Sequence, residues 1–328
     1  MRKTCRVLVA VSAMCLLLSG CGAEGGAGSG SGKNTETGGI SQSTYTKDDL
    51  DLNFSATIDE TTIIDENGIK VTAKGLTYSN YSADLELVLE NNTEDDHEFC
   101  CGTAGYGYNS INGFSVGGGY FTQDVSAGGS ETVTASFPLD ELTLLGFTDI
   151  AEIGIGIQVA DGMDVYYESG EVMIRTSAAG SYDLSGNPFI AAMDGGILPA
   201  VYEYTINKSE KDVYKNGDIS IESMYVYTNK SGAQCVMVQT YNAGSEKAYV
   251  NSRDIYVNGE EVYEGIWSSA GILPGKRAIL TIDLSRVIDD YEESDVTKKG
   301  ADSIAFTFRL NDERGSEVWS EPITIEMK

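Results

Sequence analysis

Two stretches decide the fold: residues 67–73 read NGIKVTA, and residues 85–92 read LELVLENN. Apolar and polar side chains alternate in both, which is the two-residue period of a strand with one buried face. The Asn-Gly pair at 67–68 favours a tight hairpin turn. Alternation returns at residues 132–137 and 153–159, with Gly- and Asn-containing turns between the segments. Short strands separated by such turns predict an all-β antiparallel sandwich or barrel.

The same landmarks recur about 150 residues later in the chain. Asn67-Gly68 matches Asn216-Gly217, and Asn112-Gly113 matches Asn258-Gly259. Because seven such landmarks recur in order, we predict two tandem copies of one domain, residues 55–176 and 202–328. Each copy has one short helical candidate, at 138–145 and 284–291. Residues 177–201 are rich in Gly and Ser and predict a linker between the copies, packed in part through Phe189 and Ile190.

The order of these motifs resembles a known family. An NGI-led strand, an L-x-L-x-x-N-N strand end, a V-N-G turn and a Gly-led strand are similar to the small Ig-like domains found in lipoproteins of Gram-positive bacteria. The resemblance covers most of residues 60–328, but its motifs are turns and strand patterns. It therefore implies a fold, two tandem antiparallel Ig-like β-sandwiches with one short helix each, and it implies no catalytic residue.

The N-terminus has the features of an export signal. Basic residues precede a 12-residue apolar run at 7–18, which is too short to span a membrane as a helix. Leu18-Ser19-Gly20-Cys21 follows, and it resembles the lipobox of bacterial lipoproteins, in which the signal (here 1–20) is removed and the Cys is lipidated. An ordinary cleaved signal with a chance cysteine is the alternative. Residues 21–54 are expected to be the lipidated Cys21 and a flexible Gly/Ser-rich tether.

The lipobox resemblance implies where the protein is located. A diacylglyceryl group brings two acyl chains, which anchor a protein stably where one chain does not. The membrane is therefore the first expected partner, through Cys21, and the expected location is the extracytoplasmic face of the cell membrane.

Three cysteines remain after the expected signal and Cys21 are set aside: Cys100, Cys101 and Cys235. An odd number with two adjacent members does not make a disulfide framework. Cys100 and Cys101 either form a vicinal disulfide or point to opposite faces of one strand, and Cys235 is expected to lie in a buried strand.

The charge is strongly acidic, with 22 Lys and Arg against 50 Asp and Glu, a formal net charge of −28. This balance argues against nucleic-acid binding, which needs clustered basic residues. The acidity is uneven: residues 52–176 hold 21 acids and 3 bases, whereas residues 200–328 hold 22 and 14. A domain with this balance favours cationic partners or divalent ions.

Catalytic patterns are scarce. His97 is the only histidine, in a segment expected to be a solvated polar loop leading into a strand. The sequence contains no nucleophile elbow, zinc-ligand spacing or dinucleotide loop. Calcium is the one cofactor that the composition suggests, and only weakly, because none of the acidic clusters has the ligand spacing of an EF-hand. Those clusters lie at residues 161–164, 289–295 and 311–313.

Aromatic residues interleaved with glycine give the strongest candidate for a ligand face. The alternative is that these rings pack over the open ends of their own sandwiches. The candidate ligand-binding residues are Tyr106, Tyr108, Phe114, Tyr120 and Phe121 in the first copy, and Tyr263 and Trp267 in the second.

These observations favour a membrane-anchored, non-catalytic binding or scaffolding module at the bacterial cell surface, with a surface protein or glycan as partner. Two alternatives stay open. One is a lipid-anchored enzyme of unrecognised type, which would need a cleft with perturbed acids. The other is a solute-capturing lipoprotein, a class that normally has more helix than this sequence predicts.

Overall fold

A computed structural model describes residues 54–102, 109–162, 164–261, 268–284, 301–311 and 316–327, with Val318 described only in its backbone. The predicted all-β class is confirmed, because nearly every described element is a strand and almost all strand pairs are antiparallel. The elements of the first half are β1 (Thr61–Glu66), β2 (Ile69–Tyr78), β3 (Ser82–Asn91), β4 (His97–Cys101), β5 (Ser110–Ile111), β6 (Phe114–Ser115), β7 (Phe121–Val125), β8 (Ser130–Pro138), α1 (Leu139–Leu144), β9 (Glu152–Asp161) and β10 (Asp164–Arg175).

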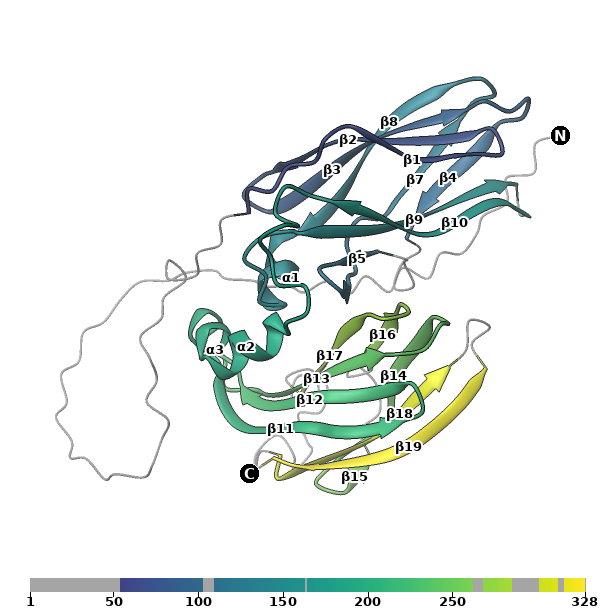
Figure 1. Ribbon diagram of the computed structural model, residues 1–328. Helices are drawn as coiled ribbons and strands as arrows, with labels where there is room; N and C mark the ends of the chain where they lie inside the picture. Colours follow the sequence, from purple (N-terminus) through teal and green to yellow (C-terminus); the bar gives the residue numbers. More distant parts are fainter. Residues whose placement is uncertain are drawn as a thin grey trace.

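The second half begins after two short helices and again consists of strands (Figure 1). These elements are α2 (Pro188–Asp194), α3 (Ile197–Val201), β11 (Thr205–Asn216), β12 (Ile219–Thr228), β13 (Gln234–Asn242), β14 (Ala248–Val257), β15 (Glu260–Glu261), β16 (Ser268–Ile272), β17 (Arg277–Asp283), β18 (Ser303–Asn311) and β19 (Glu317–Glu326).

The strands of the first half form two facing sheets. One sheet has the order β1-β2-β3-β8, and the other contains β10, β9, β4 and β7, with β5 pairing β9. Strands β2, β3 and β8 therefore oppose β4, β9 and β10, which is the A-B-E and C-F-G division of an Ig sandwich.

Strand pairs of the second half correspond to those of the first. The order β11-β12-β13-β17 matches β1-β2-β3-β8, and the pairs β18–β19, β14–β18 and β14–β16 match β9–β10, β4–β9 and β4–β7. Two tandem copies of one domain would give this correspondence of strand pairs. The division at the expected boundaries, residues 55–176 and 202–328, stays a prediction.

Both of the stretches that decide the fold contribute to the core of the first half. Ile69, Val71 and Ala73 on β2 are fully buried, and so are the three leucines of β3, at 85, 87 and 89. Because side chains alternate along a strand, one face of each strand supplies this core, and the other face is more polar and mostly part-exposed, with Thr72 as a buried exception. The period-two prediction is confirmed for both strands.

The Asn-Gly turns have the expected geometry. Asn67 and Gly68 have φ of 53° and 79°, and Asn112 and Gly113 have φ of 48° and 82°. Two successive positive φ angles are the requirement of a type I′ hairpin turn, which favours Asn followed by Gly. The hairpins between β1 and β2 and between β5 and β6 are thus encoded locally.

One predicted helix is confirmed, and two helices were not predicted. The candidate at 138–145 is α1, whereas the candidate at 284–291 lies almost wholly outside the described residues. The segment expected to be a linker contains α2 and α3. Asn187 caps α2 by accepting a hydrogen bond from the backbone N–H of Ile190 at 3.2 Å, with a proline as the first helical residue. Asn followed by Pro is a helix-start signal that the sequence analysis missed.

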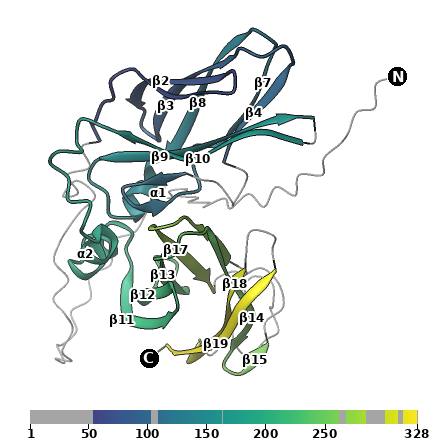
Figure 2. The ribbon, with the colours of Figure 1, turned by 45° about the vertical axis from the view of Figure 1, so that its right-hand side comes forward.

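Helix α2 lies between the two halves (Figures 1 and 2). Phe189 is fully buried, and its ring meets that of Tyr225 on β12 edge to face, with centroids 5.7 Å apart. The halves also meet where β6 pairs with β17 in parallel, and the backbone N–H of Arg277 donates to the carbonyl of Gly113 at 2.9 Å. The core of the first half therefore continues onto β12 and β13.

Candidate functional site

The predicted aromatic face is only partly covered by the described residues. Four of its members lie outside them: Tyr106, Tyr108, Tyr263 and Trp267. Phe114 is fully buried and packs edge to face on Phe147 at 5.5 Å, so its assignment to a ligand face is wrong. Tyr120 is 70% exposed, and Phe121 is half-buried against the core. Of the described members, Tyr120 is the one available to a ligand.

The glycines before Tyr120 serve packing rather than flexibility. A Cβ on Gly119, which has φ of 82°, would lie 2.4 Å from the ring of Phe137, and one on Gly118 would lie 2.6 Å from Pro138. The backbone here lies directly against β8, which only glycine allows. Residues 109–119 are mostly buried for this reason. The glycines in the sequence did not show that the backbone here packs against β8.

The sequence suggested that His97 lies in a solvated loop, and this prediction is wrong. His97 begins β4, is 3% exposed, and its ring stacks on Tyr166 of β10 with centroids 4.3 Å apart. Neither ring nitrogen has a hydrogen-bond partner. Neither thiol of the same strand bonds to this imidazole: the Sγ of Cys101 donates to Asn109 at 3.3 Å, and that of Cys100 to Glu98 at 3.5 Å.

The thiols of Cys100 and Cys101 face opposite sides of β4, which is one of the two arrangements expected from the sequence. Cys101 is buried and Cys100 is half-buried, and both are free. Burial raises the pKa of Cys101 to about 12 and also raises the pKa of Cys100. Cys235 lies in buried β13, as expected, and burial raises its pKa to about 12. These thiols stay protonated at neutral pH, whereas a nucleophilic cysteine needs the thiolate.

The described ranges contain no group of three or more His, Cys, Asp or Glu side chains arranged to hold a metal ion. Of the acidic clusters considered for calcium, Asp161 and Asp164 flank the β9–β10 turn, and the other two lie wholly or mostly outside the described ranges. Calcium binding stays a weak prediction. In the same parts of the chain, no helix is long and apolar enough to cross a membrane.

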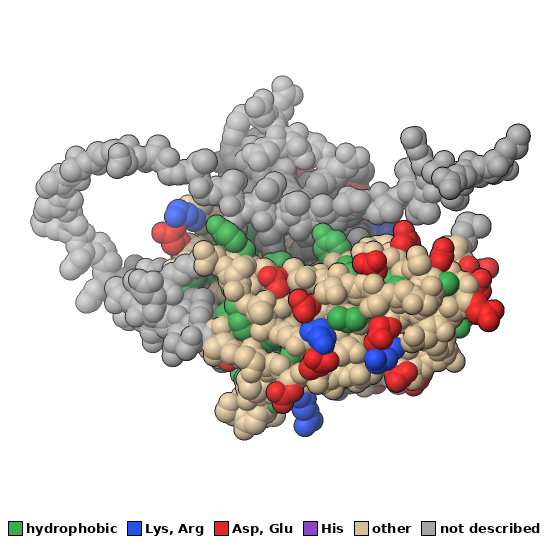
Figure 3. Space-filling model, turned by 90° about the horizontal axis from the view of Figure 1, so that it is seen from above, with side chains coloured by type: hydrophobic (Ala, Val, Ile, Leu, Met, Phe, Trp, Pro, Cys, Tyr) green, Lys and Arg blue, Asp and Glu red, His purple; other side chains and the backbone are tan. Residues whose placement is uncertain are grey.

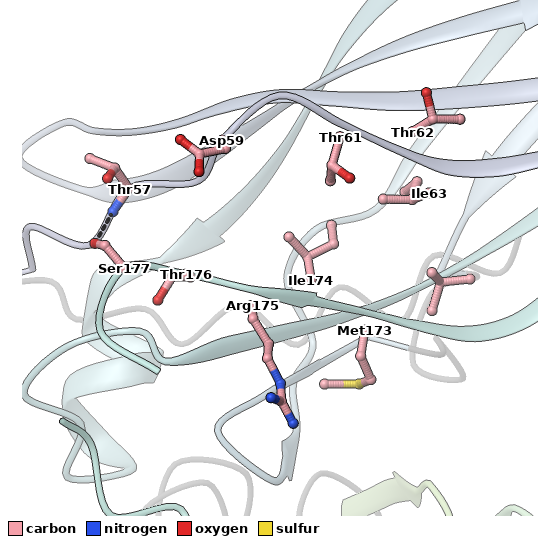
Figure 4. Close-up of a pocket in the computed structure, with 11 residues that line it drawn as sticks. Thr57, Asp59, Thr61, Thr62, Ile63, Met173, Ile174, Arg175, Thr176 and Ser177 are labelled. Atoms are coloured by element: carbon pink, nitrogen blue, oxygen red, sulfur yellow. Dashed lines mark hydrogen bonds between the residues drawn. The ribbon is translucent and has the colours of Figure 1, made fainter. Parts of the chain in front are cut away.

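A groove opens between the edges of the two sheets in the first half (Figure 4). Its volume is about 620 Å³. Strand β1 and the segment before it form one wall, and β10 with the two residues after it forms the other. The lining residues are Thr57, Asp59, Thr61, Thr62, Ile63, Val172, Met173, Ile174, Arg175, Thr176 and Ser177.

Side chains alternate along the β10 wall of the groove. Ile174 is buried and points toward the β1 wall, whereas Met173 and Arg175 extend to the opposite side of β10 (Figure 4). The groove is closed at one end by backbone pairing, because the N–H of Ser177 donates to the carbonyl of Thr57 at 2.8 Å. The Oγ of Ser177 accepts from the N–H of Thr57 at 2.9 Å.

The segments that form the groove are acidic. Residues 54–66 and 164–177 together hold seven Asp and Glu and one basic residue, Arg175. Two of these acids have cationic partners: Glu60 pairs with Lys74 at 2.6 Å, and Glu171 with Lys276 of the second half at 3.5 Å. Acidic side chains are also spread over the upper face of the first half (Figure 3). The groove lining itself holds one acid, Asp59, and one base, Arg175, so the negative field that attracts cations comes from the acids around the groove.

Sequence reasoning did not find this groove. Its walls are about 110 residues apart in the chain, and each wall is an ordinary polar-apolar strand in isolation. The one available signal was the concentration of acids in residues 52–176, which pointed to the correct half but to no residue.

Comparison with known proteins assigns no family. No family model matches the chain, and no curated protein matches its sequence. Solved structures that overlap it include the YadV chaperone, at 8% identity over 74% of this chain and 92% of that chain, with a TM-score of 0.21. The Salmonella enterica SafA pilin in complex with the SafB chaperone overlaps at 9% identity over 74% and 89%, with a TM-score of 0.19.

A larger protein also overlaps. The exo-chitosanase CsxA of Amycolatopsis orientalis matches at 12% identity over 76% of this chain and 26% of that chain, with a TM-score of 0.23. This chain thus spans about a quarter of that enzyme. TM-scores near 0.2 leave the family and the activity of this chain unassigned.

Proposed function

We propose that the chain is a membrane-anchored extracytoplasmic lipoprotein whose β-sandwiches act as a non-catalytic binding or scaffolding module at the bacterial cell surface. The observation that carries the binding role is the groove between β1 and β10, which lies in the strongly acidic first half of the molecule. The lipobox resemblance at Cys21 supports the anchor. The raised pKa of each described thiol argues against a cysteine nucleophile, because that role needs the thiolate.

The anchor is tested by fractionating a bacterial host that produces the chain. We expect the protein in the membrane fraction, and we expect the Cys21→Ser variant, which removes the thioether-forming sulfur, in the soluble fraction. Metabolic labelling with a palmitate analogue gives the direct readout. Equal membrane retention and equal labelling of both forms would contradict lipidation at Cys21.

The binding role is tested with the Cys21→Ser chain immobilised on a solid support. Solubilised surface proteins and a glycan array are passed over it, with and without calcium. Saturable retention of a protein or glycan is the expected result, and retention of nothing under either condition would count against the proposal. The calcium arm shows whether a divalent ion contributes.

A further inference from the structure

The edge of β10 that faces the groove has free backbone donors. The backbone N–H of Thr176 donates to the carbonyl of Ala151 next to β9, at 3.0 Å, whereas that of Ser177 donates outward to Thr57. Pairing with β9 is regular from Glu171 to Arg175, so successive N–H groups alternate between the two sides. The N–H groups of Met173 and Arg175 therefore point to the outer edge, in line with that of Ser177.

No second strand pairs with this edge within the described part of the chain. Proteins protect such edges with lysine or proline, because unpaired N–H and C=O groups bind other strands. The counterpart strands of the second half have this protection: β11 carries lysines at 208, 211 and 215, and β19 carries Pro322. Neither β1 nor β10 contains a lysine or a proline.

Strand β10 instead exposes apolar side chains. Val165 is 57% exposed, Tyr166 43% and Met173 39%. Register shifts on either side of Tyr167 and Glu168 interrupt its pairing with β9, so the regular part that a further strand could follow is Glu171–Arg175. This part borders the groove, where Ile63 and Ile174 supply apolar contacts.

We propose that the groove is the docking site of an extended, basic segment of a partner protein, which adds to the open edge of β10 as a further strand. The proposal rests on the proposed binding function and specifies its partner. Backbone hydrogen bonds to Met173 and Arg175 supply the pairing, and alternate side chains of the segment contact the groove. Basic side chains of the segment meet Asp59 in the groove and Glu168 farther along β10, and neither acid pairs with a described cationic side chain.

Thr57 already makes one backbone hydrogen bond to the residue that continues this edge, although Thr57 itself lies outside any strand. Its backbone occupies the position next to Ser177 that the first residue of an added strand would take. The partner segment extends that pairing along β10 toward Glu171. Self-association through this edge is disfavoured, because two copies would bring together walls that each carry an excess of acids.

The test uses the full chain carrying Cys21→Ser and a fluorescein-labelled octapeptide of alternating lysine and valine with blocked ends. Fluorescence polarisation is expected to show saturable binding. Met173→Pro removes one outward N–H and leaves the ladder with β9 intact, so we expect binding to weaken at least about tenfold. The matched control Met173→Ala keeps the N–H, and we expect it to bind within about threefold of the parent chain.

Circular dichroism shows whether Met173→Pro folds. If it does not, two control peptides still test the proposal on the parent chain. An otherwise identical peptide with alternate backbone nitrogens methylated cannot pair as a strand, and we expect it not to bind. A glutamate–valine peptide should also fail, because its charge matches that of the groove. Equal binding of the methylated peptide overturns strand addition, and equal binding of the glutamate peptide overturns the choice of a basic partner.

The two proposals fail separately. If the lysine–valine peptide does not bind while the immobilised chain still retains a surface protein or glycan, docking on β10 is wrong and the binding module stands. If the peptide binds as expected and nothing is retained from the surface extract, the groove is a peptide site whose partner lies elsewhere.

Discussion

At the scale of single residues, two buried asparagines hold equivalent corners of the two halves. The amide nitrogen of Asn91 donates to the carbonyls of Asp95 and Val125, at 2.8 and 3.0 Å. That of Asn242 donates to the carbonyls of Glu246 and Ile272, at 2.8 and 3.1 Å. Each side chain thus ties the end of a core strand to the turn after it and to a strand of the facing sheet.

Asn91→Ala should destabilise the protein by about 1–3 kcal/mol, since the buried carbonyl of Val125 loses its donor, whereas the carbonyl of Asp95 keeps a hydrogen bond from Thr93. Its neighbour Asn92 is exposed, and Asn92→Ala is the matched control, expected to stay within about 0.5 kcal/mol. Urea unfolding followed by circular dichroism measures both. Similar losses for the two variants would contradict the role given to the buried amide.

His97 is a residue at which the fold tolerates an unsatisfied polar group. His97→Phe removes two buried nitrogens that have no partner and keeps a ring against Tyr166. We expect stability to be unchanged or increased, because replacing an unpartnered polar group by an apolar one of similar shape carries no penalty. His97→Ala leaves a cavity and should destabilise. Thermal melting compares them, and a lower midpoint for the Phe variant would indicate a polar partner for the imidazole.

The buried thiols make stability depend on pH in the alkaline range. Burial raises the pKa of Cys101 and Cys235 to about 12 in the folded chain, against ~8.5 for an unfolded thiol. The unfolded chain therefore loses these protons first, so each thiol's contribution is complete below pH ~8.5 and is lost as the pH rises toward 12. We expect the free energy of unfolding to fall by up to about 1.4 kcal/mol per pH unit for each thiol.

Urea unfolding at a series of pH values between 8 and 11 measures this slope. Cys101→Ala is the informative comparison, because it removes one titrating group and leaves the tyrosines that also ionise in this range. Its slope should be shallower than that of the parent chain. Parallel slopes would show that the thiol is not protonated preferentially in the folded state.

At the scale of elements, helix α2 contacts the second half through the ring of Phe189 and through Asp194, which accepts from Tyr225 at 2.8 Å and pairs with Lys211 at 3.0 Å. Phe189→Ala should cost about 3–5 kcal/mol, because it empties a fully buried site against Tyr225. Ile190 is only half-buried on the same helix, and Ile190→Ala should cost clearly less. Equilibrium unfolding compares the two variants. An equal, small effect would mean that α2 does not contribute to the packing between the halves.

The elements also show what could be predicted locally. Hairpin turns and core strands follow from adjacent residues, so the Asn-Gly turns and the alternation on β2 and β3 were predicted correctly. Helix α2 was missed although Asn187 and Pro188 signal its start, because Gly and Ser around it were interpreted as a linker. The groove was missed because it exists only between two strands distant in sequence.

At the scale of the whole molecule, the charge is a source of repulsion. The chain has a formal net charge of −28, and Glu98 lies directly opposite Asp124 across β4 and β7. Salt screens such repulsion, with a Debye length near 8 Å at physiological ionic strength. We therefore expect the urea midpoint to rise when NaCl is increased from about 10 to about 150 mM. Glu98→Gln should raise the low-salt midpoint, and a midpoint that falls with salt would contradict net repulsion.

The sequence by itself determined the strand periods, the hairpin turns and the uneven acidity, because these depend on residues that are neighbours in the chain. Only the tertiary structure decided which strand faces are buried by other parts of the chain and which stay exposed. It buried Phe114 and His97, left Tyr120 exposed, and placed Thr57 against Ser177 across 120 residues of sequence. A period of two reports that a strand has two faces, whereas burial and free edges depend on which distant strand packs beside it.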